Sequence, residues 1–142
     1  MAKQDRNIRL GGFQLNKISA EKNSNFKGKL EIDSNINLKN IEKYKPDIAK
    51  QDSLKIEFSF KIDYKELGNI NLEGSLFLIL DNKTMKEILQ GWEKNNIPQE
   101  LHITLLNIIV QKSSLRAFEL EEELGLPLHI RLPRLQPQQN KK

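Results

Sequence analysis

The sequence predicts an α+β domain in which a four-stranded antiparallel sheet is packed on one face by two C-terminal helices. Two observations carry this prediction. Residues 53–80 alternate between apolar and polar side chains, and successive side chains of a strand point to opposite faces of a sheet. After residue 80 the apolar residues recur every three or four positions, which is the period of a helix.

The stretch from Ser53 to Leu80 is the centre of the predicted fold. Its first half places an apolar residue at every even position from 54 to 64, and Leu67-Gly68-Asn69 then permits a reversal, since Gly and Asn tolerate positive φ. The second half keeps the even parity. We therefore expect a β-hairpin with one buried face. Phe77 lies on the polar face, so we expect it either to be covered by the C-terminal segment or to belong to a contact patch.

Two further strands are expected before this hairpin. The first covers residues 8–22, where the apolar residues change parity, which indicates a bulge near Gly11-Gly12 or Asn16-Lys17. The second covers residues 28–41, with a kink at 33–35. Residues 42–52 are charged and contain one proline, which favours a connection, and a long crossover more than a tight turn.

A short helix is expected directly after the hairpin. Asp81 and Asn82 are candidates for its N-cap, and Thr84 with Glu87 matches a capping box. Its apolar stripe consists of Met85, Ile88, Leu89 and Trp92.

A long helix is expected from Pro98 to Leu124, with Gly125 as its left-handed cap. The stripe expected along one side consists of Leu101, Leu105, Ile108, Lys112 and Leu115. Further apolar residues widen this surface beyond what one sheet can cover. We therefore expect the chain to associate with itself as a homodimer or homotetramer.

The C-terminal segment alternates again, with Leu126, Leu128, Ile130 and Leu132 on one parity. Its prolines withhold backbone donors, which is typical of an edge segment or a packed arm. We expect residues 126–135 to pack on the sheet or on a partner subunit through these apolar side chains. Residues 8–135 are expected to form a single domain, and residues 1–7 and 136–142 to be disordered.

Composition narrows the classes of function. The chain of 142 residues has no cysteine, which excludes disulfides and thiolate chemistry. It has no apolar run close to the roughly 20 residues that span a bilayer, and no signal-peptide core, so we expect a cytoplasmic protein without membrane insertion. Although the formal charge is +4, Lys and Glu are interspersed and form no basic stripe, so we do not expect nucleic acid as a partner.

No catalytic constellation is visible in the sequence. His102 and His129 are the only histidines and lie at opposite ends of a long element, so without cysteine we expect neither a metal site nor a cofactor. Ser113-Ser114 has no histidine at a useful spacing. The carboxylates at 121–123 occupy adjacent helical positions and point apart, so we expect a solvated helix end and not a catalytic pair. We expect a binding protein and not an enzyme.

The order of elements, together with the terminal LPLHIRLPRL, resembles the SecB-like chaperones, in particular an archaeal-type branch. The resemblance implies a four-stranded sheet with two helices on one face, dimers or tetramers, and the holding of unfolded polypeptides or preproteins in apolar grooves without ATP. Export-pathway members engage a motor ATPase through an acidic sheet surface. Here that face carries charges of both signs, at Lys55, Glu57, Lys61 and Asp63, so client holding is the part carried over.

We expect the client groove between residues 42–52, the second strand and the short helix. The candidate client-binding residues are Leu38, Ile41, Tyr44, Ile48, Met85, Leu89 and Trp92. Methionine suits a surface that must accept many shapes. Two alternatives stay open: a dedicated partner of one toxin or secreted protein, and a nucleic-acid-associated module that uses the basic tail.

Overall fold

A computed structural model describes residues 8–45 and 52–131 of the chain. The expectations for residues 1–7, for Ile48 and for residues 132–142 concern parts of the chain outside this description. In chain order the elements are β1 (Arg9–Lys22), β2 (Asp33–Tyr44), β3 (Ser53–Asp63), the short 3-10 helix η1 (Lys65–Leu67), β4 (Gly68–Ile79), α1 (Asn82–Glu93) and α2 (Gln99–Leu124).

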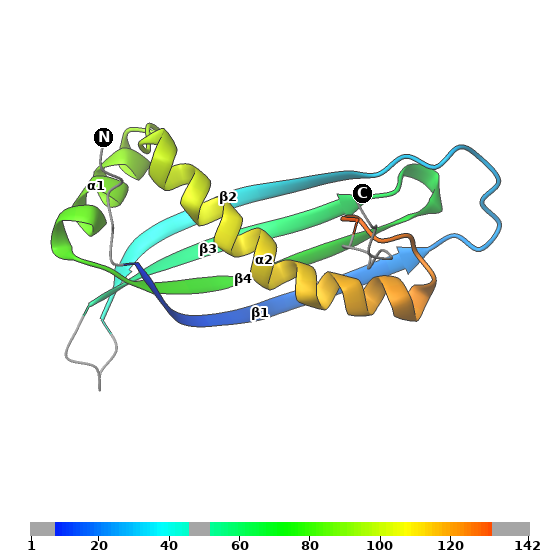
Figure 1. The fold of residues 1–142 in the computed structure, drawn as a ribbon, viewed down its shortest axis with the longest axis horizontal. Helices are drawn as coiled ribbons and strands as arrows, with labels where there is room; N and C mark the ends of the chain where they lie inside the picture. Colours follow the sequence, from blue (N-terminus) through cyan, green and yellow to red (C-terminus); the bar gives the residue numbers. More distant parts are fainter. Residues whose placement is uncertain (1–7, 46–51, 132–142) are drawn as a thin grey trace, which may run out of the picture.

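The strands form the predicted four-stranded antiparallel sheet, in the order β1-β4-β3-β2 (Figure 1). The central pair is the predicted hairpin β3–β4, which reverses through η1, so the turn lies slightly before the predicted one and Gly68 and Asn69 already belong to β4. The even positions of β3 from Leu54 to Ile62 are buried, so the predicted parity is confirmed. Both bulges proposed for β1 are also present, because its register shifts between Leu10 and Gly12 and between Leu15 and Lys17.

The crossover lies elsewhere than predicted. β1 and β2 occupy opposite edges of the sheet, so residues 23–32 make the crossover, and β2 begins only at Asp33. Residues 42–52 are not a crossover, since β2 continues to Tyr44, which pairs with Ser53 of the adjacent β3. The charges of residues 42 and 43 suggested a loop, but an edge strand with exposed side chains accommodates such residues.

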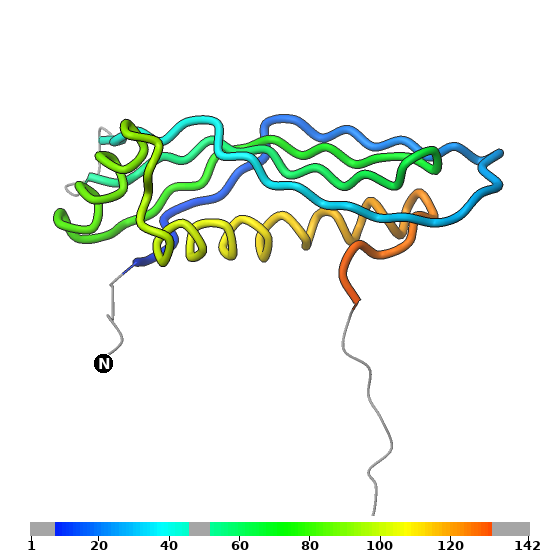
Figure 2. Tube along the Cα trace, turned by 90° about the horizontal axis from the view of Figure 1, so that it is seen from above, coloured from blue at the N-terminus to red at the C-terminus, as the bar shows by residue number. Residues whose placement is uncertain are grey.

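The helices complete a second layer. α2 lies across one face of the sheet and α1 lies at one end of it (Figure 1, Figure 2). Two clusters of buried side chains fill the space between the layers. The cluster near α1 includes Phe58, Leu76, Met85, Ile88 and Leu105. The cluster near the end of α2 includes Phe60, Tyr64, Leu72, Ala117 and Leu126.

The face that α2 turns to the sheet differs from the predicted stripe. Its buried residues step by four, from Leu101 through Leu105 and Ile109 to Ala117, while Leu115 is 63% exposed. A row of residues four apart winds slowly around a helix, so it follows a twisted sheet that the helix crosses at an angle. Gly125, at φ 74°, supplies the predicted left-handed cap.

The N-terminus of α1 is capped by one of the two predicted residues. The Asp81 carboxylate accepts hydrogen bonds from the Thr84 backbone N–H at 2.9 Å and from the Thr84 hydroxyl at 2.8 Å. Thr84 therefore lies inside the helix, and the capping box proposed to start at Thr84 was wrong. In the described residues, neither helix combines the length and the apolar character needed to cross a membrane.

Candidate functional site

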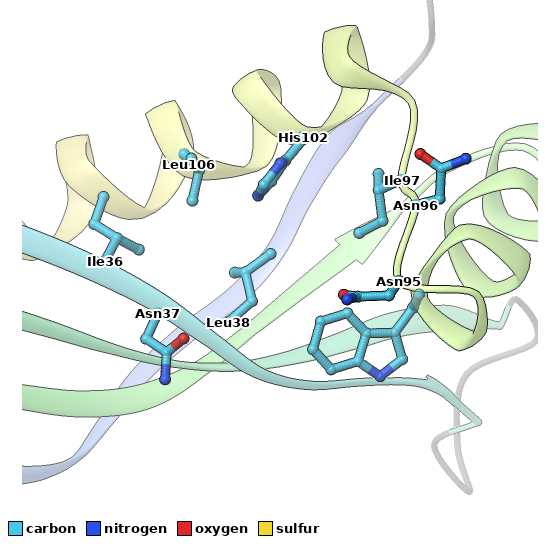
Figure 3. Close-up of a pocket in the computed structure, with 9 residues that line it drawn as sticks. Ile36, Asn37, Leu38, Asn95, Asn96, Ile97, His102 and Leu106 are labelled. Carbon is cyan, nitrogen blue, oxygen red and sulfur yellow. The ribbon is translucent and has the colours of Figure 1, made fainter.

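A cavity of about 550 Å³ opens between the edge strand β2, the first turns of α2 and the connection from α1 to α2 (Figure 3). We call it the Trp92 cavity. β2 supplies one wall, α2 supplies the opposite wall, and the connection closes the end near α1. The lining residues are Ile36, Asn37, Leu38, Trp92, Asn95, Asn96, Ile97, His102 and Leu106.

Gly91 allows the connection to fold back against α1 and form this wall. The backbone N–H of Asn96 donates to the carbonyl of Gly91 at 2.6 Å, and Asn95 takes a positive φ of 57° to make the turn. A Cβ at position 91 would lie 2.7 Å from the Cα of Ile97, which is shorter than any ordinary contact. The cavity wall therefore depends on a glycine inside a helix, at a position that is otherwise unfavourable for it.

The chemistry of the lining is apolar and amide. None of the lining residues is Asp, Glu, Lys or Arg, so a charged ligand would find no counter-charge there. The Asn amides offer both donors and acceptors. β2 is an edge strand, and among the described residues it pairs with β3 alone, which leaves its outer edge available for main-chain hydrogen bonds. The arrangement suits an extended, uncharged stretch of polypeptide.

The predicted client-binding residues do not all reach this cavity. Leu38 and Trp92 line it. Ile41 and Met85 are buried in the core, and Leu89 packs against that core while half-buried. Their roles in binding a client stay predictions, as does that of Ile48.

Tyr44 lies apart from the cavity, on the face of the sheet that α2 leaves open. Its ring packs against that of Phe77 at a centroid distance of 5.2 Å. Phe77 thus forms an aromatic pair with an exposed residue, which favours the contact patch of the two predicted alternatives. The same open face carries charges of both signs: Lys39 donates a hydrogen bond to Glu73 at 3.2 Å, and this lowers the pKa of the Glu73 carboxyl.

Sequence reasoning missed the polar half of the lining. Asn95 and Asn96 follow the end of α1, and nothing local in the sequence indicates that they also face a strand more than fifty residues earlier. His102 was treated only as a possible metal ligand. Among the described residues there is no group of His, Asp and Glu that could hold a metal ion.

A second polar group lies at the other end of α2 and is buried. The Glu121 carboxylate accepts hydrogen bonds from the Tyr64 hydroxyl, from His129 Nδ1 at 2.8 Å and from the His129 backbone N–H at 3.0 Å. His129 Nε2 lies 3.0 Å from the Ser114 hydroxyl. Burial, reinforced by the hydrogen bond to Glu121, raises the pKa of Tyr64 well above its ordinary value, so its hydroxyl is a donor at neutral pH.

Ser114, His129 and Glu121 stand in the order of a hydrolase triad, a juxtaposition that sequence spacing did not reveal. Ser114 is only 5% exposed, and the His129 side chain is 1% exposed. The rings of Phe60 and Phe118 flank His129 at 5.6 and 5.2 Å. A substrate has no path to the serine hydroxyl, so the group attaches the C-terminal segment to the body of the protein.

The orientation of that segment differs from the predicted packing of its apolar side chains on the sheet, whereas their packing on a partner subunit stays a prediction. Leu126 is buried as expected, but His129 points inward, while Leu128 and Ile130 are each 40% exposed. The prediction ranked side chains by apolarity alone. The imidazole of His129 takes the inward position because it forms hydrogen bonds with the buried Ser114 hydroxyl and Glu121 carboxylate.

Comparisons with known proteins support the fold. No protein-family model matches the chain, and no curated protein sequence matches it. Among solved structures, the chain is similar to the Mycobacterium tuberculosis Rv1957 SecB-like chaperone in complex with a ChAD peptide from the Rv1956 HigA1 antitoxin. The identity is 12%, the similarity covers 91% of this chain and 90% of that chain, and the TM-score is 0.56. The chain therefore has a SecB-like fold.

Proposed function

We propose that the protein is a holding chaperone that binds non-native polypeptide in the Trp92 cavity and along the free edge of β2, without ATP. The observation that carries the proposal is the cavity itself: about 550 Å³, bounded by a strand edge that no other described strand pairs with, and lined without Asp, Glu, Lys or Arg. Edge pairing holds a client by its main chain, and the apolar walls accept its side chains, which gives affinity without sequence specificity. The likeness to a SecB-like chaperone solved with a peptide supports the same function.

The test is suppression of aggregation of an unrelated unfolding protein in the absence of nucleotide. We expect Trp92→Ala to weaken client binding by about 2 kcal/mol or more, as truncation of an interface anchor does. Its effect on stability should stay below the roughly 3–5 kcal/mol of a buried core aromatic, since Trp92 is only half-buried. Leu30→Ala is the control, because Leu30 is an exposed apolar residue outside the cavity. Loss of stability with unchanged client binding in Trp92→Ala would overturn the assignment.

We also propose that the chain assembles with itself. Ile103 and Leu115 on α2 are exposed apolar residues that the sheet does not cover, and burying them needs a second surface. A stable interface of this kind covers about 1,200 Å² or more. Light scattering at micromolar concentration should give a mass above that of the 16.5 kDa monomer. A monomer mass under those conditions would contradict assembly but would leave the cavity proposal standing.

A dedicated chaperone for one partner is the second candidate. It is favoured by the neighbouring structure, in which a SecB-like chaperone holds a peptide of one antitoxin. Competition separates the two candidates. Two unrelated unfolded clients should displace each other from a general chaperone, whereas a dedicated one would bind neither. Placement in an archaeal-type branch likewise stays a proposal.

A further inference from the structure

We propose that residues 126–131 occupy one end of the same groove whose open end is the Trp92 cavity, so that this segment of the chain competes with long clients. The inference rests on the proposed function and adds a regulation of the same site. It assigns a role to the buried group around His129, which client holding does not use.

Neighbouring residues on the sheet and on α2 link the Trp92 cavity to the segment. Ile36 lines the cavity and pairs in register with Phe60, whose ring contacts His129. Leu106 lines the cavity on α2, and Ser114, which contacts His129, follows eight residues later on the same helix. Eight residues of helix rise about 12 Å. The segment turns back along α2 at the end of the helix opposite α1 (Figure 1).

The segment is attached as a bound peptide would be. Among the described residues no strand ladder holds it, and its backbone-to-backbone hydrogen bond to the body runs from the Leu126 N–H to the Glu121 carbonyl, at 2.8 Å. Side chains also hold its main chain, because the Pro127 carbonyl accepts from the Tyr64 hydroxyl at 2.9 Å and the His129 N–H donates to the Glu121 carboxylate at 3.0 Å. Beyond that point the attachments run through side chains, and the buried imidazole of His129 is the principal one. The neighbouring Leu128 and Ile130 contribute little, since both are exposed.

Two polar atoms of α2 near the docked segment lack partners. Glu121 Oε1 and Ser113 Oγ are buried and make no hydrogen bond to any described residue. A buried polar atom without a partner weakens the state that contains it. The polar group around His129 is therefore incompletely satisfied while the segment is docked.

The competition has a measurable consequence, because a client needs the segment to be undocked. The apparent affinity equals the intrinsic affinity multiplied by the fraction of molecules whose segment is undocked. A short client that fills only the Trp92 cavity does not meet the segment. A client about four residues longer spans the additional 12 Å in extended form and does meet it.

The experiment compares two uncharged, tryptophan-free synthetic peptides of alternating Leu and Thr, about six and about twelve residues long. The variant is His129→Ala, and the control is Leu128→Ala, which removes an exposed residue of the same segment. We expect His129→Ala to tighten binding of the long peptide by about fivefold, the gain for a segment docked about 80% of the time. The short peptide and the control should show no change. Equal tightening of both peptides, or no tightening of the long one, would overturn the inference.

A second readout does not depend on the stability of the variant. Because the chain has no cysteine, Ile130→Cys provides one attachment point for a spin label. Saturating long peptide should make the label mobile, whereas saturating short peptide should leave it immobile. A label that stays immobile with the long peptide contradicts the inference alone. Failure of the short peptide to bind the wild-type chain would instead remove the proposed function, and the inference with it.

Discussion

The two ends of the helix-covered face use polar groups in opposite ways. At the α1 end, the cavity is lined by Asn amides and an exposed histidine that solvent or a ligand can satisfy. At the other end, Tyr64 and His129 donate hydrogen bonds to one oxygen of the Glu121 carboxylate, and the three side chains are buried together. Burying a carboxylate is strongly unfavourable unless donors accompany it. The end away from α1 is closed because Tyr64 and His129 supply hydrogen-bond donors to the buried Glu121 carboxylate.

The largest expected effect comes from breaking the closed end. Glu121→Ala leaves the Tyr64 hydroxyl and His129 Nδ1 buried without their acceptor, so we expect a loss of about 3 kcal/mol or more in the free energy of unfolding. Denaturant unfolding followed by circular dichroism measures it. Glu119→Ala is the control, since this residue is exposed and bonded only to Arg116, and less than about 1 kcal/mol is expected. Equal effects of the two variants would show that the buried group does not hold the closed end.

A substitution at the open end should lower the stability less, and it should also weaken peptide binding. In Gly91→Ala the new Cβ would meet the Cα of Ile97 at 2.7 Å and the Asn96 carbonyl at 2.9 Å, so the cavity wall must move. We expect a loss of about 1–3 kcal/mol in stability together with loss of peptide binding. Gln90→Ala, an exposed change on the same helix, should alter neither. Retention of full peptide affinity by Gly91→Ala would contradict the role of this wall.

Alkaline pH should lower the stability of the closed end in particular, through Tyr64. Burial and Glu121 raise the pKa of Tyr64, so its proton is held more tightly in the folded state than in the unfolded one. The resulting stability is complete below the unfolded value of about 10 and is lost as pH rises toward the folded pKa. Above pH 10, Tyr64 should therefore lower the stability by no more than about 1.4 kcal/mol per pH unit. Tyr64→Phe should remove this part of the slope, and an unchanged slope between pH 9 and pH 11, roughly, would contradict it.

Local patterns predicted the parts of the fold that depend on local causes. The even parity of β3 and β4, the bulges of β1, the Asp81 cap and the Gly125 cap each follow from a few adjacent residues, and each was confirmed. The crossover was misplaced because the charges of residues 42 and 43 are typical of a loop, whereas an exposed edge strand can carry the same charges.

The sites were only partly predictable, because their contacts are far apart in the sequence. Leu38 and Trp92 could be proposed from strand and helix patterns, but the amides opposite them could not. The hydrogen bond from Tyr64 to Glu121 spans 57 residues, and that from His129 to Ser114 spans 15. The hydrophobic periodicity of a strand or helix does not reveal pairs that lie so far apart in the sequence. Apolar alternation also did not indicate that His129, between Leu128 and Ile130, takes the inward position, because it gives no weight to a buried hydrogen-bond acceptor.

Trp92 provides the most direct measurement of the central claim, that the open end of this face binds polypeptide. It is the only tryptophan of the chain and it lines the cavity, so its fluorescence reports on the site without a label. Titration with the short uncharged, tryptophan-free peptide should give a saturable blue shift of the emission. Because no Asp, Glu, Lys or Arg lines the cavity and the peptide is uncharged, this shift should change little with salt. Binding detected by calorimetry without any change in Trp92 emission would contradict the claim and place the client elsewhere.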